Sequence, residues 1–182
     1  MTRLLCLDTA LDACTVAYAE DGRLGPHRHE PMRRGQAEAL VPMIERVIAE
    51  AGIAPAALDA LAVTVGPGAF TGMRIGIAAA RGLALALDRP LVALTTGEAI
   101  AAAQPHEAAG APDPLLVALE TKRADLYLML YPTGDPGGGL DPVARAPDAL
   151  PDLLAAGLGE RAAAGPLRIA GDGRARAGAA LE

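Results

Sequence analysis

The stretch from Leu58 to Leu94 limits the fold of this 182-residue chain more than any other segment. A short apolar run, Leu58–Val65, leads into the glycine-rich loop Gly66–Gly72 (GPGAFTG), a helical stretch Met73–Leu87 and a second apolar run, Leu91–Leu94. A strand, a helix and a strand in this order predict parallel strands joined by a right-handed crossover. We therefore expect an α/β fold in which helices pack on a sheet that is at least partly parallel.

The N-terminal segments predict an antiparallel meander ahead of this unit. Arg3–Thr9 and Ala13–Glu20 have strand-like sequences, and a third strand is expected at Arg23–His29, after the turn Asp21-Gly22. Gly25-Pro26 makes this third strand an edge strand if it forms. Apolar residues at helical spacing then predict a helix over Arg34–Gly52, in which Pro42 marks a kink or a late start.

A second, shorter series of strands and helices follows. A helix is expected at Gly97–Ala103, and the proline-containing stretch Gln104–Pro114 is expected to be a loop or linker. Beyond it, the sequence predicts strands at Leu115–Glu120, Asp125–Tyr131 and Leu167–Ala170, with a helix near Ala149–Ala156. We therefore predict two related α/β halves, residues 1–103 and residues 104–182.

Composition excludes several functions. The net charge of −6 argues against independent binding to nucleic acid, and the absence of serine excludes a serine nucleophile. Cys6 and Cys14 are expected to be buried free thiols, and no Cys/His cluster has metal-binding spacing. Met1–Thr9 does not resemble a signal peptide, and no uncharged apolar stretch reaches membrane-spanning length, so a cytoplasmic protein is expected.

The glycine-rich loop joins a strand to a helix, a position where a helix N-terminus can bind an anion. No Gly-Lys-Ser/Thr follows it, and its GxGxxxG spacing differs from the dinucleotide-binding pattern. A structural turn is therefore favoured over a phosphate-binding loop. The next helix carries Gly72, Gly76 and Ala80 at four-residue spacing, which makes a smooth face for close packing. On sequence alone, packing inside the fold is favoured over a subunit interface for this face.

A candidate degenerate nucleotide site consists of residues at strand ends and turns. Asp8 follows the first strand and Glu120 ends the equivalent strand of the second half, where carboxylates can hold hydrated Mg²⁺. Ordinary turn functions suit every member of the set and are favoured. The set is Asp8, Thr9, Glu120, Lys122, Arg123, Gly171 and Gly173.

Four blocks of the sequence resemble a known family. They are LLCLDTALDACTVA, RGQAEALVPMIERVIAEAG, LDALAVTVGPGAFTGMRIGIAAARGLALAL and VALETKRADLYLML, and they span roughly residues 3–131. In this order they are similar to the bacterial tRNA threonylcarbamoyladenosine biosynthesis protein B family (TsaB, formerly YeaZ). The resemblance implies the actin-like ATPase fold, with two ribonuclease-H-like halves whose mixed sheets are flanked by helices. The family's Pro-Leu-Tyr-Leu-Arg-type tail is missing before Glu182, so a natural short form and a truncated second half are both open.

The resemblance further implies a non-catalytic subunit, because the family lacks the metal-binding histidines of its catalytic paralogue. Gln36, Glu38 and Ala39 offer no histidine pair at helical spacing. The implied partners are the catalytic threonylcarbamoyltransferase, a small P-loop ATPase and, through the complex, tRNA at the adenosine beside the anticodon. A homodimer is a further expectation for the isolated chain. The chain alone is expected to bind no metal or cofactor, and ATP or ADP with Mg²⁺ is considered only at the interface of the complex.

The same resemblance implies that the helices Gly35–Ala51 and Phe70–Leu87 form the partner interface. Under this interpretation, Gly76→Glu and Ile44→Asp are expected to abolish dimerisation and to leave the fold largely intact. The implied interface residues are Ala37, Leu40, Val41, Ile44, Val47, Ile48, Phe70, Met73, Gly76 and Ala80.

An independent nucleotide hydrolase or kinase of the actin-like class is the alternative function. In that case Asp8 and Glu120 would position Mg²⁺, and Gly171–Gly173 would face an adenosine. No glycine follows Glu120, which makes this alternative the weaker one, since a fold alone does not confer an activity.

Overall fold

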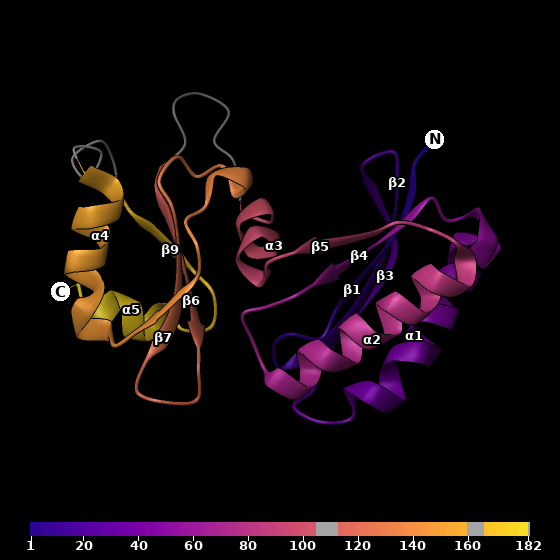
Figure 1. Cartoon of the computed structure of the whole chain (residues 1–182), viewed down its shortest axis with the longest axis horizontal. Helices are drawn as coiled ribbons and strands as arrows, with labels where there is room; N and C mark the ends of the chain where they lie inside the picture. Colours follow the sequence, from indigo (N-terminus) through magenta and orange to yellow (C-terminus); the bar gives the residue numbers. More distant parts are fainter. Residues whose placement is uncertain (105–112, 160–165, 182) are drawn as a thin grey trace. The chain divides into compact units, whose positions relative to one another are not determined.

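The computed structural model describes residues 1–104, 113–159 and 166–181 of the chain (Figure 1). The chain divides into two compact units, Met1–Thr95 and Thr96–Glu182. This division places the predicted helix Gly97–Ala103 in the second unit, whereas the sequence analysis assigned it to the first half. Most of the predicted linker Gln104–Pro114 lies outside the described residues.

Unit 1 contains a five-stranded mixed sheet with the strand order β3-β2-β1-β4-β5. The antiparallel meander comes first, and β4 and β5 then add parallel to β1. The strand with Gly25-Pro26 lies at the sheet edge, as predicted. The strands are β1 (Arg3–Asp8), β2 (Ala13–Glu20), β3 (Arg23–Pro31), β4 (Ala60–Thr64) and β5 (Leu91–Leu94).

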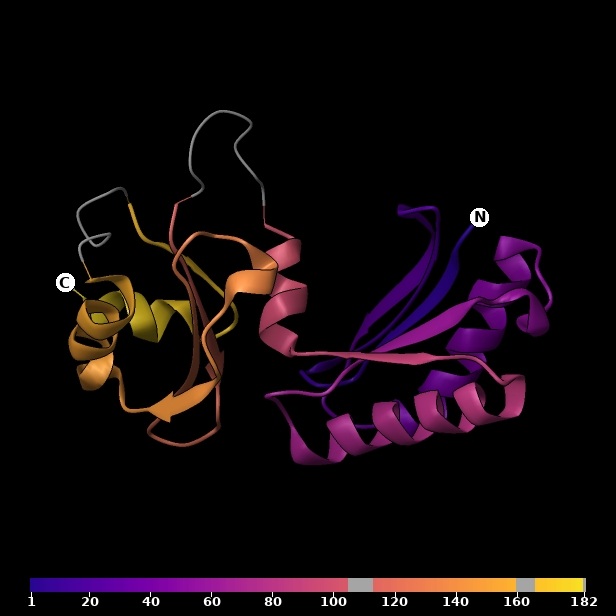
Figure 2. The ribbon, with the colours of Figure 1, turned by 45° about the horizontal axis from the view of Figure 1, so that its top comes forward.

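Two helices, α1 (Gln36–Ala51) and α2 (Phe70–Leu87), lie side by side on one face of this sheet (Figures 1 and 2). The first packs against β2 and β3, and the second against β4 and β1. Each helix connects two strands that run parallel to each other, so both helices run in the same direction, opposite to those strands. The first helix continues through Pro42, so the predicted late start at this residue is wrong.

The core of unit 1 lies between the sheet and the helix pair. Alternate strand residues and one stripe of each helix fill it, as the two sequence periods require. Cys6 and Cys14 are free thiols, as predicted, and only Cys14 is fully buried. The main buried side chains are Leu5, Leu7, Cys14, Val16, Tyr18, Leu40, Met43, Ile44, Val47, Leu58, Leu61 and Val63.

Unit 2 repeats this arrangement in a smaller form. Its sheet has the order β8-β7-β6-β9, which corresponds to β3-β2-β1-β4 of unit 1, with the same parallel and antiparallel pairs. The predicted pair of related ribonuclease-H-like halves is therefore confirmed. The strands are β6 (Leu115–Glu120), β7 (Leu126–Tyr131), β8 (Val143–Arg145) and β9 (Arg168–Ala170). The helices are α3 (Thr96–Ala102), α4 (Leu150–Leu158) and α5 (Arg174–Ala179).

Two of these elements escaped prediction from the sequence. β8 has three residues and α5 has six, and segments of this length show too few periods for a pattern to be recognised. α5 lies in what the composition shows only as an alanine-rich tail. Both are held by their neighbours, β8 by pairing with β7 and α5 by contacts with β6 and β9.

In the part of the chain that the structure describes, one helix is long and apolar enough to cross a membrane by length and composition, and this is α2. In unit 1 it forms the crossover between β4 and β5. A stripe of small residues buries its inner side against the sheet, namely Gly72, Gly76, Ala80 and Ala84.

Candidate functional site

Side chains at the end of β1 form hydrogen bonds with β4 and with the start of α2. Oδ1 of Asp8 accepts hydrogen bonds from the backbone N–H of Ala10 at 2.9 Å and from the hydroxyl of Thr64 at 2.5 Å. The hydroxyl of Thr9 is almost completely buried and donates to the carbonyl of Gly72 at 2.7 Å. These bonds connect the β1–β2 turn to β4 and to the first turn of α2.

Three glycines allow the helix to approach this turn so closely. A Cβ atom at Gly68 would collide with the carbonyl oxygen of Ala10, and one at Gly72 would collide with that of Thr9. A Cβ atom at Gly76 would lie 2.5 Å from the Thr9 hydroxyl. The four-residue spacing places Gly72 and Gly76 on successive turns of α2 that face the end of β1, and Gly68 lies in the loop just before the helix. The geometry agrees with the structural turn favoured from the sequence and with packing inside the fold.

Protein backbone fills the space between this loop and the end of β1. The backbone of Thr9 and Ala10 occupies the space that the missing Cβ atoms of Gly68 and Gly72 leave open. Oδ1 of Asp8 already accepts two hydrogen bonds from the protein. The glycine-rich loop is therefore a packing element of unit 1.

The end of β6 carries an ion pair that the sequence analysis missed. Nη1 of Arg176 lies 2.6 Å from Oε2 of Glu120, and the same guanidinium donates to the carbonyls of Arg123 and Ala124. The backbone N–H of Glu120 donates to Oδ1 of Asp172 at 2.9 Å. The candidate metal-binding carboxylate of unit 2 is therefore neutralised by a cation from α5.

The turn Gly171–Gly173 packs against β6 in the same manner as the glycine-rich loop of unit 1. A Cβ atom at Gly171 would collide with the carbonyl oxygen of Ala118, and one at Gly173 would lie 3.1 Å from it. The N–H of Gly173 donates to this same carbonyl at 3.0 Å. The two glycines thus allow the turn to pack closely on β6.

The hairpin after β6 places the remaining two candidates on the surface. Lys122 and Arg123 are exposed, and Lys122 has a positive φ of 64°. The Thr121 hydroxyl donates to Asp125 at 2.7 Å, and this hydrogen bond holds the pKa of the Asp125 carboxyl below its usual range. The hairpin is thus closed by its own polar side chains.

The seven candidate nucleotide-site residues are divided between the two units. The structure gathers Glu120, Lys122, Arg123 and the two glycines near one end of β6, where the Arg176 guanidinium pairs with one oxygen of Glu120. Asp8 and Thr9 lie in unit 1 and bond to their own loop. Among the described residues, no group of three or more His, Cys, Asp or Glu side chains is arranged to hold a metal ion.

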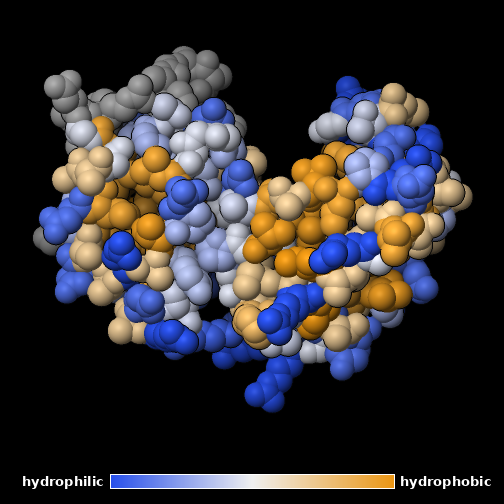
Figure 3. All heavy atoms as spheres, viewed as in Figure 1, coloured by the Kyte–Doolittle hydropathy of each residue, from blue (hydrophilic) through white to orange (hydrophobic). Residues whose placement is uncertain are grey.

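The outer surface of α1 and α2 presents large apolar side chains to solvent. Val41 is 54% exposed, Phe70 is 63% exposed and Leu85 is 86% exposed. The guanidinium of Arg74 stacks 3.8 Å from the centre of the Phe70 ring. Figure 3 shows apolar side chains interspersed with hydrophilic ones along α2. We call this outer surface of the two helices the helix-pair face.

The structure divides the predicted interface residues into two groups. Ala37, Val41 and Phe70 are exposed on the helix-pair face, and Met73 is partly exposed. The other six are buried within unit 1, namely Leu40, Ile44, Val47, Ile48, Gly76 and Ala80. These six position the helices but do not reach the surface. Because Ile44 and Gly76 are buried, Gly76→Glu and Ile44→Asp would also disturb the packing of unit 1 itself.

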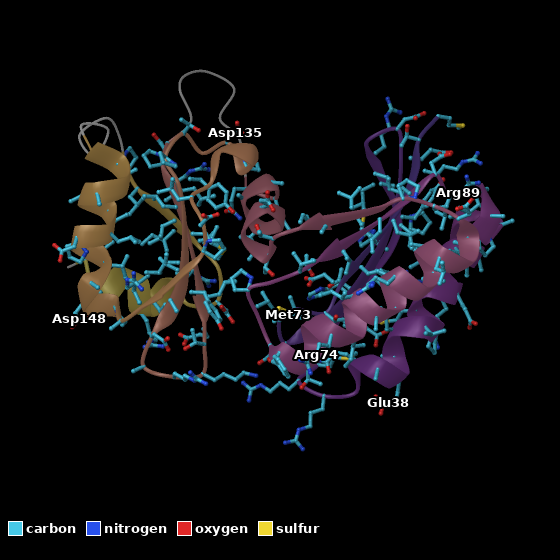
Figure 4. All side chains as sticks on the ribbon, viewed as in Figure 1. Glu38, Met73, Arg74, Arg89, Asp135 and Asp148 are labelled. Atoms are coloured by element: carbon cyan, nitrogen blue, oxygen red, sulfur yellow. The ribbon has the colours of Figure 1, made fainter. Side chains whose placement is uncertain are left out.

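Sequence reasoning missed other residues of the helix-pair face. Leu85 is the most exposed of its large apolar residues, and Glu38 and Arg74 lie at the end of the pair where both helices begin (Figure 4). The apolar stripe of a helix marks the side that faces its own core. The residues on the opposite side of each helix could therefore have been used to predict its outer face.

Comparisons with known proteins agree with this architecture. The family described as TsaD: tRNA N6-adenosine threonylcarbamoyltransferase matches residues 30–146. The chain is 39% identical over 94 residues to the tRNA threonylcarbamoyladenosine biosynthesis protein TsaB of Escherichia coli strain K12, a match that covers 52% of this chain and 40% of that protein. It is 35% identical over 126 residues to the TsaB protein of Haemophilus influenzae strain Rd, which covers 68% of this chain and 51% of that protein.

A solved structure shows the same fold. A Pseudomonas aeruginosa protein described as similar to the peptidase YEAZ superposes with a TM-score of 0.71 and 34% sequence identity, over 81% of this chain and 68% of that one. The chain spans about half the length, or less, of the two TsaB proteins that it matches.

The two duplicated α/β units, with the end of β1 facing a glycine-rich turn, define a protein of the actin-like ATPase superfamily. Within this superfamily, the sequence identities to both TsaB proteins and to the Pseudomonas structure point to a single family. The chain belongs to the TsaB/YeaZ family.

Proposed function

We propose that this chain is a non-catalytic subunit in the biosynthesis of tRNA threonylcarbamoyladenosine. It binds a TsaD-like threonylcarbamoyltransferase through the helix-pair face, and the transferase supplies the catalytic groups. The observation that carries the proposal is the exposure of Val41, Phe70 and Leu85 on one helix layer. Large apolar side chains that are exposed together on one surface are typical of a protein-binding site.

The buried residues beneath this face support the proposal. Gly72, Gly76, Ala80 and Ala84 fix α2 against the sheet, and the Thr9–Gly72 hydrogen bond fixes its first turn. The face is therefore presented on a rigid support, which lowers the entropy that is lost when a partner binds.

The remaining parts of the proposal follow from the family. A small P-loop ATPase and tRNA join through the complex, which works in the cytoplasm. The chain itself holds no metal or cofactor, and ATP or ADP with Mg²⁺ belongs to the interface of the complex. The ion pair between Glu120 and Arg176 and the packed glycine loop favour this assignment over an independent nucleotide hydrolase or kinase.

The test is to measure binding to the catalytic paralogue from the same organism by analytical ultracentrifugation. Phe70→Glu and Leu85→Glu place a charge on the helix-pair face and are expected to weaken binding by roughly tenfold or more each. Leu24→Glu is the matched control, because Leu24 is 66% exposed in the same unit but lies on β3. It should bind like the native chain.

A tRNA modification assay completes this test. The native chain should be required for modification together with the transferase, and the two helix variants should lose it in proportion to their binding. Equal binding by the native chain and both helix variants would overturn the assignment of the face. Nucleotide turnover by the isolated chain that Asp8→Asn removes would instead establish the independent enzyme.

A further inference from the structure

The edge strand β3 carries two of the chain's three histidines, His27 and His29. Their register partners on β2 are Ala17 and Thr15, which alternate with the buried residues of that strand that face α1. Because side chains alternate between the two faces of a sheet, both imidazoles lie on the face opposite the helix pair. Both are exposed. The two rings therefore form an accessible pair on one face of unit 1.

The Nδ1 atom of each ring is hydrogen-bonded to an oxygen atom of the protein. In His27 it lies 3.0 Å from the carbonyl oxygen of Gly25, and in His29 it lies 2.9 Å from the hydroxyl oxygen of Thr15. A carbonyl can only accept a hydrogen bond, so Nδ1 of His27 carries the hydrogen and the lone pair of the neutral ring is on Nε2. The Thr15 hydroxyl can accept in the same way, which places the lone pair of His29 on Nε2 too.

This pattern of hydrogen bonds is typical of histidines that bind transition metals. A metal-binding histidine usually donates its second ring N–H to a carbonyl or another oxygen, which fixes the tautomer and orients the ring. Neutral imidazole nitrogens suit Zn²⁺, Ni²⁺ and Cu²⁺, whereas Mg²⁺ and Ca²⁺ prefer oxygen ligands. His27 and His29 meet both conditions.

The spacing of the two residues suits a single ion. Residues i and i+2 of an antiparallel strand lie about 6.8 Å apart. An ion bound to two Nε2 atoms, at about 2.0–2.1 Å from each, takes up roughly 4 Å of that separation. The rings therefore need to lean only slightly toward each other, and their exposure leaves room for this movement. Since two histidines are fewer than the four ligands of a structural zinc site, water completes the coordination.

We infer that His27 and His29 bind one divalent transition-metal ion through their Nε2 atoms. The Gly25 carbonyl and the Thr15 hydroxyl orient the two rings. Cu²⁺ should bind more tightly than either Ni²⁺ or Zn²⁺. The inference goes beyond the proposed function, which calls for no metal in this chain. Because the pair and the helix-pair face lie on opposite sides of the sheet, loss of the metal should leave transferase binding unchanged.

The test is isothermal titration of the full chain, without an affinity tag, with Ni²⁺, which does not oxidise thiols as Cu²⁺ can. The native chain should bind one ion. His27→Gln and His29→Gln should each weaken binding by more than about tenfold, because loss of even an orienting group costs about 10–100-fold. Thr15→Val removes the acceptor for His29 and should weaken binding by about tenfold, whereas Thr15→Ser keeps the hydroxyl and should bind like the native chain.

Two control variants distinguish this pair from other groups of the chain. His106→Gln removes the third histidine and should leave binding unchanged. His29→Gln with Glu30→His keeps three histidines but moves one of them to the other face of the sheet, because neighbouring strand residues point to opposite faces. This split pair should bind as weakly as His29→Gln alone. Circular dichroism should show each variant folded.

Three results would overturn the inference. They are a native chain that binds no Ni²⁺, binding that survives both His27→Gln and His29→Gln, and binding to the split pair that equals the native value. Binding of Mg²⁺ as tight as that of Ni²⁺ would likewise contradict ligation by imidazole. Each of these results leaves the proposed function standing, because its test is binding to the transferase.

Discussion

The contact between α2 and the end of β1 makes a sharp prediction for Gly72→Ala. A Cβ atom at this position collides with the carbonyl oxygen of Thr9, which is backbone and cannot rotate away. The helix must therefore shift, which costs about 1–3 kcal/mol for overpacking. The shift also strains the Thr9–Gly72 hydrogen bond, worth about 1 kcal/mol. The higher helix propensity of alanine returns about 1 kcal/mol. We expect a net loss of about 1–3 kcal/mol.

Gly82→Ala is the matched control in the same helix. Gly82 is exposed, and a Cβ atom there meets nothing within 4 Å, so only the helix propensity changes. This variant should be more stable than the native chain by up to about 1 kcal/mol. Urea unfolding followed by circular dichroism measures both, and hydrogen exchange over residues 70–87 assigns the loss to α2. Equal effects of the two substitutions would refute the steric explanation of the glycine spacing.

Three further predictions test other parts of the two units. Thr9→Val removes the donor to the Gly72 carbonyl with little change of shape, and urea unfolding should show a loss of about 1 kcal/mol. Arg176→Met removes the guanidinium that joins Glu120 to the β6–β7 hairpin, so amide exchange in residues 121–125 should become faster, and unchanged exchange would contradict this role. Burial raises the pKa of the Cys14 thiol from 9.0 to about 11, with smaller contributions from nearby carboxylates. The thiol must stay neutral in the fold, so stability should be intact below about pH 9 and should fall by an amount of order 2 kcal/mol as the pH rises toward 11. Cys14→Ala should remove this pH dependence, and an unchanged dependence would contradict the assignment.

The order of strands and helices could be predicted from the sequence because each longer element has a local pattern of apolar residues. Alternation over Ala13–Glu20 and helical spacing over Arg34–Gly52 each reflect a single element facing one core. The bounds of β2 and β5 were predicted to the residue. The short elements β8 and α5 lack such patterns, and they exist through pairing and packing that no local window contains.

The candidate site was less accessible, since its contacts join distant parts of the chain. The bond between Thr9 and Gly72 spans 63 positions, and the pair of Glu120 and Arg176 spans 56. The sequence alone shows a glycine motif and a carboxylate. It does not show the backbone carbonyls that pack on the glycines or the guanidinium that pairs with the carboxylate. The partner interface raises a different difficulty, because the apolar stripe of a helix marks the side that faces its own core. Leu40 and Val47 were therefore assigned to a partner although they face their own sheet.

The two units bond the ends of their first strands in the same way. In each unit a glycine turn after the fourth strand packs on the end of the first strand, against Thr9 and Ala10 in unit 1 and against Ala118 in unit 2. A carboxylate ends both first strands, and each is engaged by the protein itself, Asp8 with the Thr64 hydroxyl and Glu120 with the Arg176 guanidinium. The positions that could serve a nucleotide thus serve internal bonding in both halves. The helix-pair face differs, because it presents Val41, Phe70 and Leu85 to solvent. A rigid surface of this kind gains stability only when a partner covers it, which is why association is the property to measure.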